Sequence, residues 1–99
     1  MGLFNRTPPD LKDLESAIMA LAQEVAIRGK GYGTPGFLEE ELEPTVVRMW
    51  AEAQQRLAVD GRSDDLKRLR KSVLKTGTFM DNGPYNHVFR PMILEICPV

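Results

Sequence analysis

The sequence predicts a small all-α domain, in which three helices form the core and an extended C-terminal segment packs against them. Three stretches repeat apolar residues every three or four positions, the spacing that places side chains on one face of a helix. Glycine, proline and aspartate separate these stretches. Ninety-nine residues, 42% of them hydrophobic and 27% charged, suit a single globular domain over residues 1–99.

A first helix is predicted at residues 8–28. Thr7 suits the cap position, and Pro8 suits the first turn, where its missing N–H breaks no hydrogen bond. Arg28 provides a cation in the last turn, and Gly29 provides the stop. The predicted apolar face consists of Leu11, Leu14, Ile18, Leu21 and Val25.

Residues 29–36 are predicted to be a glycine-rich loop, because four glycines and a proline in eight residues disfavour both helix and strand. Part of the loop matches the G-x-G-x-x-G spacing of dinucleotide-binding loops. That pattern needs a strand before the loop, whereas a helix is predicted here. We interpret the loop as a connector, with Lys30 and Tyr32 as candidate partner-binding side chains.

A second helix is predicted at residues 44–59, with Trp50 on its apolar face. The acidic segment before it keeps helical spacing across Pro44. Two arrangements fit: a short helix at 37–42 followed by a break, or one kinked helix with an interior proline at a cost of about 3 kcal/mol. We favour the break, because proline suits the first turn of a helix.

A third helix is predicted at residues 64–76, ended by Gly77. The cations in and just before it that are candidate partner-binding residues are Arg62, Lys67, Arg68, Arg70 and Lys71. A basic helix after a short turn is also typical of helix-turn-helix DNA-binding proteins. However, Asp64 and Asp65 occupy the positions that usually meet base edges.

The C-terminal segment, residues 78–99, is predicted to lie across the helices in extended form, because three helices already supply the apolar faces and prolines interrupt the segment. Residues 85–89 within it fit either a short helical turn or a strand. The mostly apolar run at 92–96, between Pro91 and Pro98, indicates burial. Two outcomes remain open for this segment. It packs across the helices of its own chain, or it adds to the surface of a partner.

The sequence contains no motif that defines a catalytic, cofactor or metal site. A catalytic pair of His87 and Cys97 would need a partly exposed thiolate in an electropositive site. Cys97-Pro98 matches the dipeptide of haem-responsive proteins, and the glutamates at 39–43 could bind a hard cation, but both patterns are common without a ligand. We therefore predict no enzyme activity, no cofactor and no metal.

Net charge and segregated charge indicate the class of function. A formal net charge of −1 gives no overall attraction to nucleic acid or to anionic membranes. Neither a secretory signal pattern nor a membrane-spanning run is present, so we expect a cytoplasmic protein that does not bind membranes. Carboxylates gather at 39–43 and cations at 62–75.

These observations predict a non-enzymatic protein–protein interaction module, such as a small subunit, an accessory factor or an inhibitor of a larger assembly. Its partner would be another protein or a second copy of the chain. The alternative is a small nucleic-acid-binding regulatory protein that uses the basic helix at 62–75.

Overall fold

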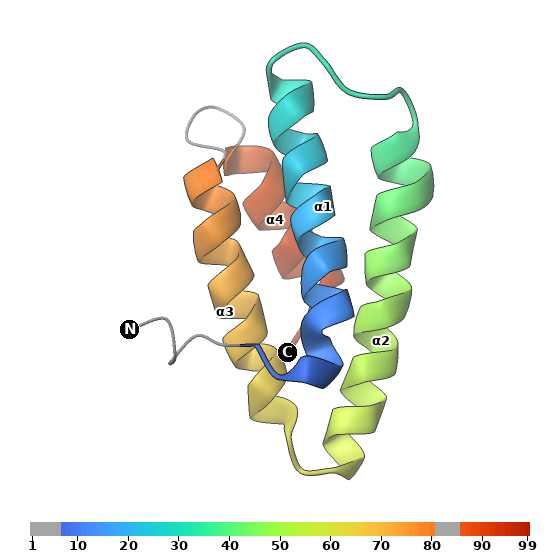
Figure 1. Cartoon of the computed structure of the whole chain (residues 1–99), viewed down its shortest axis with the longest axis vertical. Coiled ribbons are helices and arrows are strands. Elements are labelled where there is room, and N and C mark those ends of the chain that lie inside the picture. The colour runs from blue at the N-terminus through green and yellow to red at the C-terminus, as the bar shows by residue number, and fades with distance from the viewer. Residues whose placement is uncertain (1–6, 81–85) are drawn as a thin grey trace.

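Helices account for nearly all regular structure in the computed structural model of the chain, which describes residues 7–80 and 86–99 (Figure 1). The predicted all-α class is confirmed, since these described residues contain no strand. The helices are α1 (Lys12–Gly29), α2 (Glu43–Val59), α3 (Ser63–Met80) and α4 (Asn86–Ile96). In Figure 1, α1 lies between α2 and α3, and α4 lies behind them. The helix α4 contacts all three of the others.

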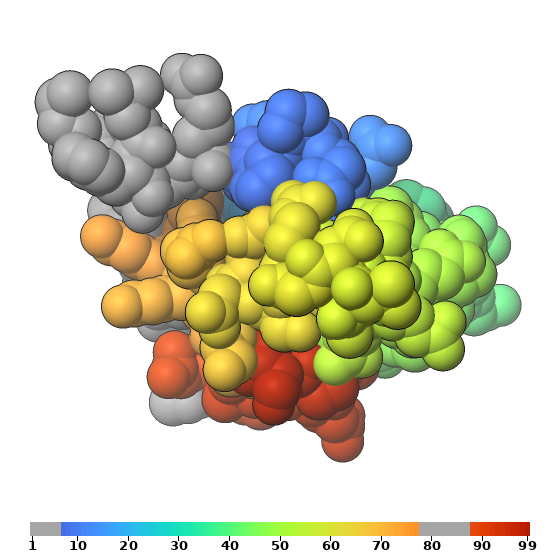
Figure 2. Space-filling view, turned by 90° about the horizontal axis from the view of Figure 1, so that it is seen from below, coloured from blue at the N-terminus to red at the C-terminus, as the bar shows by residue number. Residues whose placement is uncertain are grey.

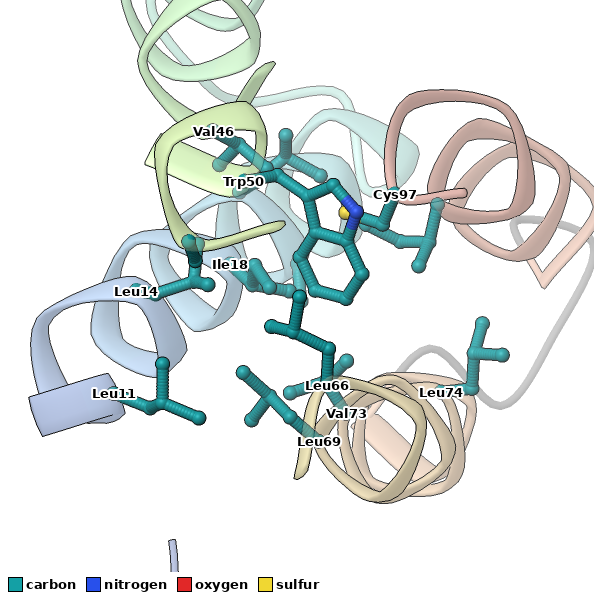
Figure 3. Close-up of a cluster of buried hydrophobic side chains, with 14 of the residues drawn as sticks. Leu11, Leu14, Ile18, Val46, Trp50, Leu66, Leu69, Val73, Leu74 and Cys97 are labelled. Atoms are coloured by element: carbon teal, nitrogen blue, oxygen red, sulfur yellow. The ribbon is translucent and has the colours of Figure 1, made fainter. Parts of the chain in front are cut away.

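The core forms where the apolar faces of these helices meet. All five residues of the predicted apolar face of the first helix are buried. Trp50 of α2 is only 1% exposed, and Figure 3 shows its indole between Ile18 of α1, Leu66 of α3 and Cys97 after α4. Burying a side chain of this size contributes roughly 1.5–3 kcal/mol or more, so Trp50 is a main anchor of the core.

The start of α1 differs from the prediction that Thr7 caps the helix. Pro8 takes an extended conformation, and a short 3₁₀ turn, η2 (Pro9–Leu11), precedes α1. Thr7 therefore lies too far back to reach the first free N–H groups, and no side chain caps this turn. Instead the buried Thr7 hydroxyl donates a 2.5 Å hydrogen bond to Oε2 of Glu15.

The predicted break before Pro44 is absent. A π-helical stretch, η3 (Leu38–Leu42), runs directly into α2, and the backbone of Leu42 and Glu43 is helical on both sides of the junction. Pro44 sits in the first turn of α2. A proline cannot donate an N–H, and its ring clashes with the carbonyl one turn earlier in a regular α-helix. The wider π turn before it is the local change that lets the helix continue.

The helix α3 continues past Gly77, which the sequence predicted to be its end. Gly77 is buried, and an ideal Cβ built on it would overlap the ring of Phe89 in α4. This glycine therefore allows two helices to approach closely, and it is not a stop signal. The cost of glycine inside a helix, about 1 kcal/mol relative to alanine, is offset by this packing.

The C-terminal segment is a helix over 86–96, and the prediction of an extended segment is wrong there. Phe89, Ile93 and Cys97 recur every four positions, and all three are fully buried. Pro91 lies inside α4 but is exposed, so its ring projects away from the core. The burial of these three apolar side chains outweighs the roughly 3 kcal/mol that an interior proline costs.

Side chains from α2 and α3 hold the chain just after α4. Trp50 Nε1 and Gln54 Nε2 each donate a 2.8 Å hydrogen bond to the carbonyl oxygen of Pro98. Arg70 Nη1 donates a 3.3 Å hydrogen bond to the carbonyl oxygen of Cys97. The last residues therefore pack on their own chain, which is the first of the two arrangements left open by the sequence.

Candidate interaction surface

The helix α3 carries two different stripes of side chains. Leu66, Leu69 and Val73 form the first stripe and are buried in the core. The second stripe is offset by one position and consists of Lys67, Arg70, Lys71, Leu74 and Lys75. Its spacing of three, one, three and one places these five side chains on one face of the helix. Figure 3 shows Leu69 and Leu74 leaving α3 on different sides.

The second stripe forms one wall of a groove of about 670 Å³ between α3 and α4, which we call the α3–α4 groove. Figure 2 shows the C-terminal residues, in red, against the gold side chains of α3. The cations that line the groove are Lys67, Arg70, Lys71, Lys75 and Arg90. Its apolar lining is Leu74, Leu94 and Val99, of which Leu94 and Val99 are 43% and 55% exposed.

The positive charge of the groove is weakly compensated. No carboxylate side chain is among its lining residues. Lys67 lies 3.8 Å from Asp64, and both side chains are well exposed, so this pair contributes little. Within the described part of the chain, Lys71, Lys75 and Arg90 have no carboxylate within 4.0 Å. Like charges held this close repel, so a negative ligand would be favoured there.

Two of the predicted partner-binding cations, Arg62 and Arg68, form ion pairs within the chain. Arg62 donates hydrogen bonds to both carboxylate oxygens of Asp10, each at 3.1 Å, and a 2.9 Å bond to Asp65. This geometry joins the turn before α3 to the start of the chain, and it raises the pKa of Arg62 while lowering that of Asp10. Arg68 forms an ion pair with the same Asp65. Both cations are thus engaged within the fold.

The glycine-rich loop places its two candidate residues elsewhere. Lys30 and Tyr32 are exposed, Tyr32 by 75%, and neither lines the α3–α4 groove. The loop joins α1 to the π-helical stretch, so the strand that a dinucleotide-binding loop needs is not before it. The predicted partner-binding residues therefore do not form one surface: only Lys67, Arg70 and Lys71 line the groove.

The loop is held against α1 by a buried carboxylate. Glu24 is 7% exposed, and its Oε2 accepts a 3.0 Å hydrogen bond from the backbone N–H of Thr34. A Cβ on Gly33 would lie 2.8 Å from that oxygen, and the φ of +108° at this position also favours glycine. The loop runs so close to Glu24 of α1 that position 33 has room only for glycine.

Cys97 is placed as a core residue. It is fully buried, and this burial raises the pKa of its thiol to about 12, although Arg70 opposes the shift. The sulfur is therefore a neutral thiol at neutral pH, whereas nucleophilic attack and haem ligation both use the thiolate. The side chain of His87 lies outside the described residues.

Further properties of the described residues limit the kinds of site. No three His, Cys, Asp or Glu side chains among them gather as metal ligands. In the acidic segment, Oε2 of Glu39 accepts a 2.6 Å hydrogen bond from Nη1 of Arg28, and this ion pair lowers the pKa of the carboxyl group. None of the described helices has the length and apolar character needed to cross a membrane.

Comparisons with protein-family models, with curated proteins and with solved structures find no match to this chain. Sequence reasoning found three of the cations of the α3–α4 groove, Lys67, Arg70 and Lys71, because they gather in one helix. It did not select Lys75 or Arg90, although the spacing of 67, 70, 71, 74 and 75 is a signal readable in the sequence.

Proposed function

We propose that this chain is a non-enzymatic protein-interaction module whose partner docks on the α3–α4 groove. The observation that supports this proposal is the pairing of five cations with exposed apolar side chains in one groove. Arg70 and Arg90 belong to a residue type that is enriched at protein interfaces, and Leu94 and Val99 add exposed apolar surface in the same groove. The module would act as a small subunit, an accessory factor or an inhibitor of a larger assembly.

Nucleic-acid binding is the second candidate, and the regular spacing of cations along α3 favours it. Two features make a protein partner the better fit. Leu94 and Val99 offer exposed apolar surface that a phosphate backbone cannot use. Asp64 and Asp65 lie in the first turn of α3, where a recognition helix would meet bases.

The test is affinity capture from an extract of the source organism, with and without nuclease treatment, using the tagged full chain and two variants. Lys71→Glu with Lys75→Glu reverses charge in the groove. Lys12→Glu with Arg48→Glu changes net charge equally at exposed sites on α1 and α2.

We expect a protein that the wild-type chain and the control variant retain and that the groove variant loses. The purified partner should then bind the purified chain directly. Retention that disappears with nuclease would favour the nucleic-acid alternative, and equal retention by all three chains would place the interface elsewhere.

A further inference from the structure

We infer that the α3–α4 groove takes an acidic amphipathic helix of the partner protein. This inference rests on the proposed function and adds the chemistry of the partner. The groove is lined by cations of α3, by Arg90 of α4 and by the exposed apolar side chains of Leu94 and Val99. An amphipathic helix with an apolar stripe flanked by carboxylates has the complementary cross-section.

The spacing of the cations fits a helical ligand. Lys67, Arg70, Lys71 and Lys75 extend over nine positions of α3, and the eight steps between the first and the last correspond to about 12 Å along the helix axis. A helix that lies along the groove would repeat its own carboxylates at the same rise. Several ion pairs could then form without distortion of either backbone.

Two walls of the groove are positioned before any ligand arrives. The hydrogen bond from Arg70 to the carbonyl oxygen of Cys97 holds that guanidinium at the boundary of α3 and α4. The hydrogen bonds from Trp50 and Gln54 to Pro98 fix the chain next to Val99, which lines the groove. Groups that are already ordered lose less conformational entropy on binding.

A second copy of this chain fits the groove less well than a foreign helix. Its own acidic segment includes Glu39, which is paired with Arg28, and Leu38, which is buried in the core. That segment would bring carboxylates to the groove with Leu38 unavailable as an apolar contact. The groove also offers the exposed side chains of Leu94 and Val99 to the ligand, so a ligand with carboxylates alone would leave this apolar surface uncovered.

The experiment titrates the ¹⁵N-labelled full chain with a synthetic helical peptide of about four turns. Leucines form one face of the peptide, and glutamates flank them. One control peptide has the same composition in scrambled order, and another has glutamine in place of each glutamate. A DNA duplex is the third control ligand.

We expect the amphipathic acidic peptide alone to shift the amide signals of 67–75 and of the non-proline residues of 90–99. Its Kd should rise about tenfold or more in the variant Lys71→Glu with Lys75→Glu, and also rise in Leu94→Gln. The Kd should be unchanged in Lys12→Glu with Arg48→Glu. Circular dichroism of each variant confirms that its helices are intact.

Other outcomes overturn the inference in distinguishable ways. Equal binding of the scrambled peptide or of duplex DNA would mean that the groove recognises charge alone. Self-association of the wild-type chain that the groove variant loses would identify a second copy as the occupant. If the peptide fails while a captured protein still depends on Lys71 and Lys75, this inference fails and the proposed function stands. If neither depends on them, both fail.

Discussion

The indole Nε1 of Trp50 donates a 2.8 Å hydrogen bond to the carbonyl oxygen of Pro98, which lies 48 residues further along the chain. The same residue is 1% exposed at the centre of the helical core. One side chain therefore joins the hydrophobic packing of α2 to the position of the residues that follow α4. The stability of the core and the shape of the α3–α4 groove are connected through it.

Replacing Trp50 should destabilise the chain, and the loss should be larger for alanine than for phenylalanine. Trp50→Phe removes the hydrogen bond and part of the volume and should lower the free energy of unfolding by about 1–2 kcal/mol. Trp50→Ala should lower it by about 3–5 kcal/mol. Urea denaturation followed by circular dichroism measures both values. Native tryptophan emission that is red-shifted and accessible to quenchers would contradict the buried position.

The ion pair of Asp10 with Arg62 should make stability depend on pH. The hydrogen bond from Arg62 is the main cause that holds the pKa of Asp10 below its ordinary value of 3.8. A carboxyl group with a lowered folded pKa stabilises the fold above its ordinary pKa, and this contribution is lost as pH falls through the lowered pKa.

Asp10→Asn should therefore be less stable than the wild type at neutral pH, and the difference should shrink as the pH falls below about 3.8. Urea denaturation over a pH series measures this difference. Asp13→Asn is the matched control, because Asp13 is exposed and forms no ion pair with another described residue. A constant difference at all pH values would show that the ion pair contributes nothing through ionisation.

Gly77→Ala should destabilise the protein, although alanine is the better helix former. The usual gain in an open helix is about 0.5–1 kcal/mol. Here the new methyl group would overlap the ring of Phe89, and overpacking of this kind costs about 1–3 kcal/mol. The double variant Gly77→Ala with Phe89→Leu should recover part of the loss. A stabilised single variant would refute the close approach of α3 and α4.

Cys97 should react with thiol reagents only after the native fold opens. Its full burial blocks access, and the raised pKa, about 12, keeps the sulfur protonated. Because the unfolded thiol ionises near 9.0 and the folded one does not, stability should decline as pH rises above about 9.0. Labelling rates in native and denaturing buffers test this, and rapid native labelling would contradict it.

The sequence predicted the parts of the fold that follow from periodicity. The apolar face of α1 and the burial of Trp50 were readable because regular spacing and a large apolar side chain leave few alternatives. Pro91 and Gly77 misled the prediction, because each was judged by its local preference. Their neighbours decided the outcome: burial of Phe89 and Ile93 stabilises a helix that carries a proline, and contact with Phe89 uses the glycine within α3.

The groove was only partly predictable for a related reason. The cations of α3 share one helix and could be recognised together, whereas Arg90 and Leu94 belong to a segment that was predicted to be extended. Because α4 was not predicted, the side of the groove that Arg90 and Leu94 form could not be predicted either. The engagement of Arg62 by Asp10 joins residues 52 positions apart, and no local pattern specifies such a pair.

The link between Trp50 and Pro98 also has a consequence for the order of folding. Closing a contact over 48 residues costs more chain entropy than forming the local contacts within and between neighbouring helices. The docking of the residues after α4 onto α2 should therefore come after the rate-limiting barrier. Gln54→Ala, which removes one of the two hydrogen bonds to Pro98, should speed unfolding while leaving the refolding rate nearly unchanged, which stopped-flow measurements can resolve.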